Sequence, residues 1–261
     1  RMEDIRLTTA DTAMTPQGDL GTWGSRVTLM AGNAVIDAAR KIKQQLFGAV
    51  SARFNLNVIH DIECKNGRVQ ATARHDYGMS FGDAVAMVQK ANRGEPLVAR
   101  GSYTPRGKGL VTPAFGFGAQ IAEIEVDEET GLVKVKNMWT AHDCGTVINP
   151  RSVEGQLAGS IQMGLGYALS EQMIMDGGKT LSLDFADYKM PTAMDMPPSE
   201  VVHVDTFEPE GPMGAKETGE GLASPTAPAI SEAVYHATGY RCKDLPITPE
   251  KILNATRDKA E

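Results

Sequence analysis

Apolar and polar residues alternate in short stretches of the chain, and elsewhere they recur with helical spacing. Residues 120–127 and 133–136 alternate on the two sides of Thr130-Gly131, and residues 58–72 do so around Asn66-Gly67. Both stretches predict β-hairpins, because these turn residues accept the backbone angles that a tight turn needs.

Local signals mark where helices begin. Ser80 is a suitable N-cap residue, and Pro150 and Pro249 each stand where the first residue of a helix would lie. The predicted helices cover residues 27–53, 81–92, 150–172 and 224–235, and a last one opens at Thr248-Pro249, while residues 5–9 are predicted to form a strand and residues 191–198 to be irregular. Hairpins mixed with helices favour an α+β fold over a doubly wound parallel sheet.

Composition excludes several classes of protein. Hydrophobic residues make up 41% of the 261 residues, an ordinary value for a globular protein, and the net charge of −7 argues against binding nucleic acid or an anionic membrane. No apolar run approaches the ~18–20 residues that span a bilayer. Residues 1–4 do not resemble a signal peptide, so we expect a cytoplasmic location. The chain opens on Arg1, from which we expect a fragment, a cleavage product or one piece of a split subunit.

Cysteine spacing predicts no metal site. Cys64, Cys144 and Cys242 lie far apart, without the paired spacing of zinc sites or the thiolates that an iron–sulfur cluster needs. Cys144 is disfavoured as a nucleophile, because no histidine except His142 lies near it in the sequence.

The most informative segment is residues 211–221, which holds four glycines, Lys216, Glu217 and Glu220 directly before a helical pattern. Glycines allow close backbone approach, a helix N-terminus attracts anions, and a carboxylate there is a candidate general base. A phosphate-binding P-loop is excluded, because Ala215 separates Gly214 from Lys216 and Glu217 stands where Ser or Thr is required. The alternative is an ordinary glycine-rich turn with a solvated glutamate.

Residues 21–25 precede the long predicted helix in a similar way. The hydroxyl groups of Thr22 and Ser25, together with backbone amides, could hold an anionic group; the alternative is a helix start capped by Ser25. Trp23 either narrows such a pocket or packs in the core, and we favour core packing.

Gln156 and Gln162 lie on a predicted helix that also contains Gly155, Gly159 and Gly164. Each glycine costs a helix about 1 kcal/mol relative to alanine, a cost that close packing or an approaching ligand usually offsets. A buried glutamine amide could bind a pterin; the alternative is a surface glutamine.

Taken together, these segments resemble the C-terminal half of the molybdenum-binding subunit of the xanthine oxidase/dehydrogenase family. The resemblance runs from about Asp11 to about Leu253. The segments that carry it, in family order, are residues 11–16, 21–26, 32–35, 143–150, 154–171, 214–221 and 245–252.

The resemblance implies a C-terminal molybdopterin-binding domain over residues 1–261. This domain could be divided into two lobes, residues 1–112 and 113–261. The resemblance makes Glu220 the catalytic base and places Gln156 near the oxo ligand of molybdenum. Glu217 is expected to flank a helix or to form a salt bridge, and Lys216 to pair with it or with a cofactor anion. The implied cofactor-binding residues are Thr22, Trp23, Gly24, Ser25, Gln156, Gly159, Gln162 and Gly219, with Gln162 in a supporting place.

The implied enzyme is a molybdenum-dependent oxidoreductase that transfers oxygen and hydride at an aromatic, heterocyclic or aldehyde carbon. Its cofactor is molybdenum–molybdopterin, in the cytosine dinucleotide form, and electrons pass to partner subunits that carry a 2Fe–2S cluster and FAD. The hydroxybenzoyl-coenzyme A reductase branch and the N-heterocycle or aldehyde dehydrogenases are the candidates for its substrate class.

The resemblance also implies that the site is incomplete in this chain. The family's Gly-Gly-Gly-Phe-Gly segment and arginine-bearing substrate loop belong to an N-terminal half, and residues 115–118 only echo the first. A lone chain is therefore expected to be inactive and to need that half as a partner. The alternative is a non-catalytic domain that serves cofactor binding or assembly.

Overall fold

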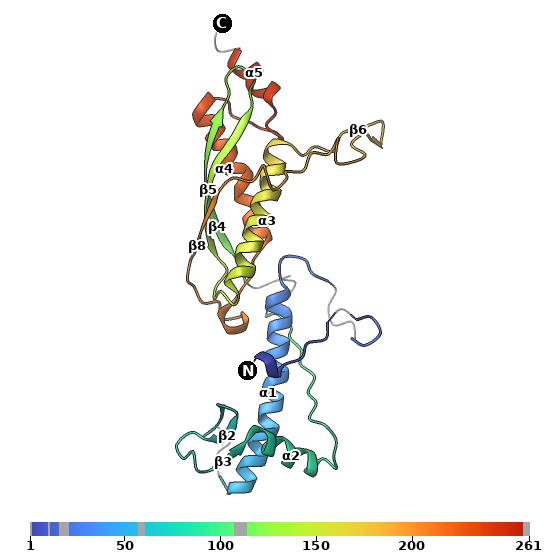
Figure 1. Ribbon diagram of the computed structural model, residues 1–261, viewed down its shortest axis with the longest axis vertical. Coiled ribbons are helices and arrows are strands. Elements are labelled where there is room, and N and C mark those ends of the chain that lie inside the picture. The colour runs from blue at the N-terminus through green and yellow to red at the C-terminus, as the bar shows by residue number, and fades with distance from the viewer. Residues whose placement is uncertain (1, 10, 16–20, 57–60, 107–113, 258–261) are drawn as a thin grey trace.

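The computed structural model describes residues 2–9, 11–15, 21–56, 61–106 and 114–257. The chain is elongated, and its helices and strands form two groups at opposite ends of the long axis (Figure 1). A short 3-10 helix, η1 (Met2–Asp4), precedes both groups.

The first group surrounds the long helix α1 (Val27–Phe54). Its other elements are β1 (Ile62–Lys65), β2 (Arg68–Ala71), β3 (Gly78–Ser80) and α2 (Phe81–Ala91). The strands form an antiparallel sheet in the order β1–β2–β3. Leu46 and Val50 of α1 pack with Val69 of β2 and Val88 of α2, so helix and sheet share one core.

The second group is a sheet covered on one face by helices (Figure 1). Its strands are β4 (Phe117–Val126), β5 (Val133–Asp143) and β8 (Ser199–His203); its helices are α3 (Pro150–Leu169), α4 (Glu220–Thr238) and α5 (Pro249–Arg257). β5 pairs antiparallel with β4 and parallel with β8. Met138, Ile161, Leu165 and Ile230 lie in the core between sheet and helices. A small hairpin, β6 (Met175–Asp176) and β7 (Lys179–Thr180), projects beyond α3.

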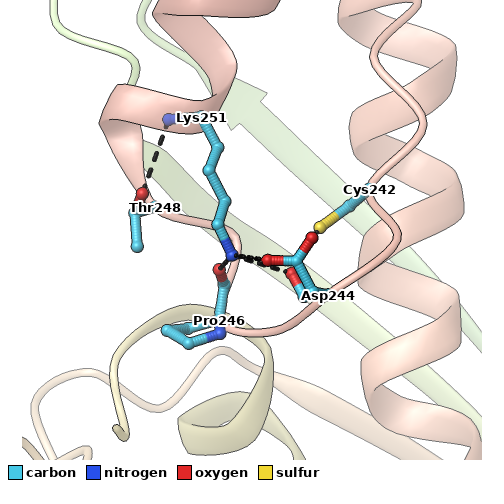
Figure 2. A network of polar contacts seen from close by, with 5 residues as sticks. All are labelled: Cys242, Asp244, Pro246, Thr248 and Lys251. Atoms are coloured by element: carbon cyan, nitrogen blue, oxygen red, sulfur yellow. Dashed lines mark hydrogen bonds and ion pairs between the residues drawn. The ribbon is translucent and has the colours of Figure 1, made fainter. Parts of the chain in front are cut away.

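A polar network fixes the segment before α5 (Figure 2). The ammonium group of Lys251 donates to the carbonyl oxygens of Asp244 and Pro246, both at 2.9 Å, and forms an ion pair with the Asp244 carboxylate at 2.6 Å. The Cys242 thiol donates to the same Asp244 carbonyl oxygen. One lysine of α5 therefore ties the helix to the loop that leads into it.

The sequence predicted most of these elements. The α+β class, both hairpins, the Ser80 cap and the helix starts at Pro150 and Pro249 are confirmed; Ser80 Oγ accepts the amide of Asp83 at 3.0 Å. Residues 191–198 are irregular, as predicted, and residues 58–60 of the first hairpin lie outside the described residues.

Two predictions about strands need correction. Residues 5–9 are not a strand: they are exposed and pair with no strand among the described residues, so the alternating pattern there has no sheet to join. β8 was not predicted, because its parallel pairing depends on β5, which is distant in the sequence. None of the helices in the described part of the chain combines the length and hydropathy that a bilayer crossing requires.

Helices α3 and α4 pack closely because of a glycine. A Cβ atom added at Gly164 of α3 would overlap the side chain of Thr226 in α4. Thr226 cannot easily move aside, because its hydroxyl group donates to Gln120 Oε1 of β4 at 2.6 Å. Gly164 therefore sets how near α4 and the sheet approach α3.

This packing predicts opposite effects for two glycines of the same helix. Gly164→Ala should lower the free energy of unfolding by about 1–3 kcal/mol, the usual cost of overpacking. Gly155→Ala should raise it by up to ~1 kcal/mol, since outside its own helix no atom of the described residues lies within 4 Å of the added Cβ and alanine favours a helix. Urea unfolding of both variants measures the difference, and equal effects would contradict the packing described.

Candidate functional site

The N-termini of three helices meet at one cavity of about 500 Å³. The first residues of α1 line it with Val27 and Thr28, α3 with Asn149 and Ser152, and α4 with Glu220. The remaining lining residues are Thr22, Trp23, Ser25, Cys144, Thr146, Ile148, Val153, Gln156, Ala215, Lys216 and Thr218. Eight of the sixteen lining residues carry a hydroxyl or amide group, so the walls offer hydrogen bonds to a ligand between surfaces that are mostly apolar.

Pairing between two distant segments brings α3 and α4 to this place. Gly145 and Ala215 form an isolated antiparallel bridge, in which the Lys216 amide donates to the Cys144 carbonyl oxygen at 2.9 Å. The Thr146 amide donates to the Gly214 carbonyl oxygen at 2.8 Å. The segment that leads into α3 is thus fastened to the segment that leads into α4.

A buried ion pair reinforces this pairing. Lys216 Nζ lies 2.8 Å from Asp143 Oδ2, and both side chains are almost completely buried. Burial alone would raise the pKa of Asp143, but hydrogen bonds from Lys216, Thr206 and the Gly145 amide outweigh it and hold the pKa below its usual value. The expected pairing of Lys216 with Glu217 is therefore wrong, because Lys216 forms its ion pair with Asp143.

Ser25, which also lines the cavity, holds Glu220 in place. Its hydroxyl group donates to Glu220 Oε2 at 3.1 Å and accepts the Glu220 amide at 3.0 Å. Ser25 therefore binds the first amide of α4, although it lies 195 positions earlier in the sequence. The interpretation of Ser25 as the N-cap of α1 is wrong: that N-cap is Arg26, without a side-chain cap bond, and Ser25 has φ 51°.

The loop before Glu220 is held by α3. Gln156 Nε2 donates to the Thr218 carbonyl oxygen at 3.3 Å, and Ser160 Oγ donates to the Gly219 carbonyl oxygen at 2.9 Å. Gly219 has φ 150°, and a Cβ there would lie 2.9 Å from Ser25 Oγ and 3.2 Å from Gln156 Nε2. A side chain at this position would therefore push apart the two groups that hold the loop.

Trp23 lies at the edge of the cavity rather than in the core. Its side chain is 43% exposed, and the Arg26 guanidinium stacks on the indole ring at 4.1 Å. The interpretation of Trp23 as a core residue is therefore wrong, because the ring packs against a cation at the cavity wall. Thr22 lines the cavity beside it, whereas Gly24, with φ 63°, turns the chain without being a lining residue.

Two other predicted residues lie elsewhere on α3. Gln162 Nε2 donates to the Pro191 carbonyl oxygen at 2.9 Å, so it ties α3 to an irregular segment. Gly159 is exposed, and no atom would lie within 4 Å of its added Cβ. Neither residue lines the cavity. The structure thus brings Thr22, Trp23, Ser25, Gln156, Gly219 and Glu220 together, and places Gly159 and Gln162 apart from them.

Glu217 is turned away from the cavity. It flanks α4, as expected, but among the described residues it forms no ion pair, and its Oε2 atom is buried without a hydrogen bond. Burial raises the pKa of Glu217, and the nearby charge of Glu220 raises it further. The neutral form of this carboxyl group is therefore favoured more than in an exposed glutamate.

The described residues contain no group of three or more His, Cys, Asp or Glu side chains placed to hold a metal ion directly. His142 and Cys144, which flank Asp143, are both buried. Burial lowers the pKa of His142, because the cation loses its hydration.

The protein family described as the molybdopterin cofactor-binding domain matches residues 1–197, which are most of this chain. The chain belongs to this family.

Relatives agree with this assignment and confirm the resemblance to molybdenum-binding subunits. The nicotine 6-hydroxylase large subunit of Paenarthrobacter nicotinovorans is 35% identical over 91% of this chain and 30% of its own length. The xanthine dehydrogenase molybdenum-binding subunit of Escherichia coli O157:H7 is 32% identical over 96% of this chain and 33% of its length. The chain thus spans about a third of the curated relatives that it matches.

Solved structures show the same fold. CO dehydrogenase from Oligotropha carboxidovorans superposes with a TM-score of 0.83 at 27% identity, over 99% of this chain and 32% of that one. Quinoline 2-oxidoreductase from Pseudomonas putida 86 gives 0.80 at 28% identity, over 90% and 30%. The α+β architecture of this molybdopterin cofactor-binding domain is therefore the one found in molybdenum-binding subunits.

Several lining residues of the domain were not predicted from the sequence. They are Thr28, Thr146, Asn149, Ser152 and Thr218. Thr146 and Asn149 lie within residues 143–150, one of the segments that carry the family resemblance, so that segment was the available signal. Thr28 had none, because its role follows from how α1 meets α3 and α4.

The buried ion pair predicts a test of the frame around the cavity. Lys216→Met should lower the free energy of unfolding by about 3–5 kcal/mol, because it leaves the Asp143 carboxylate buried without its partner. The double variant Asp143→Asn/Lys216→Met should lose much less, since no charge remains unpaired. Denaturant unfolding of the three proteins decides this, and a double variant as unstable as the single one would refute it.

Proposed function

We propose that this chain is the part of a molybdenum hydroxylase that binds molybdopterin and supplies Glu220 as the general base. The observation that carries the proposal is the convergence of three helix N-termini on a cavity in which Ser25 holds Glu220. The family assignment indicates molybdopterin as the cofactor, and we propose this cavity as its binding site.

The cavity suits a polar, phosphate-bearing organic cofactor. Backbone amides at helix N-termini favour anions, and the N-termini of α1, α3 and α4 face the same space. Thr22, Ser25, Thr28, Ser152 and Gln156 would hold such a group through hydroxyl and amide hydrogen bonds. The molybdenum would then be held by its pterin, which fits the lack of a direct metal-binding cluster among the described residues.

When bound, the molybdenum cofactor supplies the redox chemistry and the oxygen that is transferred. Glu220 then removes a proton at the reacting centre. Because Ser25 donates to Oε2, the other oxygen, Oε1, is the one that takes up the proton. The hydrogen bonds of Gln156 and Ser160 to the preceding loop keep the carboxylate in one place, which general base catalysis requires.

Partners are proposed from the relatives and from the surface. The outer face of the β4–β5–β8 sheet exposes Phe117, Ile121, Trp139 and Val202. Exposed apolar faces of this kind mark interfaces. We assign this face to the N-terminal part of the molybdenum-binding subunit, and expect further partners that carry a 2Fe–2S cluster and FAD, in the cytoplasm.

The substrate is proposed to be a small molecule oxidised at an aromatic, heterocyclic or aldehyde carbon. The names of the relatives that act on nicotine and quinoline favour a nitrogen heterocycle. The cytosine dinucleotide form of the pterin is part of the same proposal.

Glu220→Gln should abolish turnover in the assembled enzyme. The change keeps the size and the hydrogen bond from Ser25 but removes the base, so kcat should fall at least about 100-fold. Molybdenum and phosphorus contents, measured by elemental analysis, should stay normal. Glu129→Gln, in an exposed turn, is the matched control and should keep full activity. A Glu220→Gln enzyme that retains more than about a tenth of the wild-type rate would refute the base.

The chain alone should bind little molybdenum and should self-associate through the uncovered sheet face. Co-expression with the N-terminal part and the two electron-transfer subunits should restore molybdenum content and dye-linked oxidation of a heterocycle. Size-exclusion chromatography and elemental analysis measure both. Full metal content without any turnover in the complete assembly would instead favour a non-catalytic role.

A further inference from the structure

Helix α4 begins without a capping side chain. Its N-cap residue is Gly219, and its first residue is Glu220. The amides of the first turn therefore need acceptors from elsewhere. Ser25 accepts the Glu220 amide at 3.0 Å, and the Gly219 carbonyl oxygen accepts the Leu222 amide at 3.1 Å.

The carboxyl group of Glu217 lies against the next residue of this turn, since a Cβ atom added at Gly221 would overlap Glu217 Oε1. The Gly221 amide lowers the pKa of Glu217, as a donor that faces the carboxylate does. Glu217 lies two residues before the N-cap, so its side chain folds back onto the helix start. It supplies the acceptor that Ser, Thr or Asp at the N-cap position would supply in an ordinary helix. The first turn of α4 is thus held on the cavity side by Ser25 and on the other side by Glu217.

Two glycines make room for this carboxyl group. A Cβ atom at Gly116, just before β4, or at Gly221 of α4 would overlap Glu217 Oε1. The other oxygen, Oε2, is buried without a hydrogen bond among the described residues. The carboxyl group is therefore enclosed between β4 and α4, and its place is set by the backbone around it.

We propose that Glu217 is a positioning residue for Glu220: its carboxyl group replaces the missing N-cap side chain of α4 and fixes the turn from which Glu220 enters the cavity. Glu217 does not line the cavity itself. This inference rests on the proposed role of Glu220 as the base.

Glu217 has no ion-pair partner among the described residues. Lys216, the nearest cation in the sequence, is occupied by Asp143, and Glu220 lies on the same turn with the same charge. His142, buried on β5, has a lowered pKa and so favours its neutral form. A glutamine side chain keeps the size of this group and an oxygen that can face the Gly221 amide, so it should replace Glu217 closely.

Four variants of the assembled enzyme test the proposal. Glu217→Ala removes the acceptor, and Glu217→Gln keeps one. Gly116→Ala leaves Glu217 intact but displaces its carboxyl group. Gly48→Ala, on α1 with no atom within 4 Å of its added Cβ, is the matched glycine control. The readouts are kcat, KM, molybdenum content and amide hydrogen exchange of the peptide that spans the start of α4.

Glu217→Ala and Gly116→Ala should lower kcat about 10-fold to 100-fold with KM changed less than about twofold, since a small displacement of a catalytic group is costly. Exchange at the start of α4 should become about fivefold faster in both, as expected for a lost cap. Glu217→Gln and Gly48→Ala should stay close to wild type in every readout, and molybdenum content should be normal throughout.

Unchanged kcat in Glu217→Ala, or equal losses in Glu217→Ala and Glu217→Gln, would overturn the proposal. Loss of molybdenum in proportion to activity would also overturn it, because that result indicates a general structural role. Glu220→Gln, measured in the same series, separates the two claims: an inactive Glu220→Gln beside an active Glu217→Ala refutes only the role of Glu217, whereas an active Glu220→Gln refutes the base and this inference together.

Discussion

The site depends on the pairing of residues 143–146 with residues 214–216. Two backbone hydrogen bonds and one buried ion pair, Lys216–Asp143, join the end of β5 to the segment that enters α4. Because α3 starts a few residues after Asp143 and α4 a few residues after Lys216, this pairing holds the starts of the two helices close together in space. Without this pairing, the two helix starts would not be held together, and Glu220 and Gln156 would not line the same cavity.

Helix starts, rather than a cluster of charged ligands, define the chemistry of the cavity. Position 219 is a glycine because a side chain there would collide with Ser25 and Gln156. The first amide of α4 is bound by Ser25, a side chain from another part of the chain. An organic cofactor that carries its own metal fits such a site better than a bare ion does. The arrangement is consistent with membership of the molybdopterin cofactor-binding domain family.

Local signals in the sequence predicted the helices and hairpins, and long-range contacts limited the prediction of the site. The Asn149-Pro150 start of α3 and the Asn66-Gly67 turn are encoded within a few residues, so the pattern was sufficient. The bond between Ser25 and Glu220 and the ion pair between Lys216 and Asp143 join residues that only the fold brings together. The strand predicted at residues 5–9 failed for the same reason, since a strand needs a partner. The family resemblance supplied Glu220 and Gln156, which spacing alone could not.

Whether this cavity binds the cofactor is tested most directly by an anomalous X-ray difference map, recorded at the molybdenum absorption edge, from crystals of the assembled and cofactor-loaded enzyme. A single strong peak is expected in the cavity lined by Ser25, Gln156 and Glu220, with pterin density that reaches the N-termini of α1 and α3. A molybdenum peak remote from Glu220, with this cavity filled by protein side chains or solvent, would contradict it.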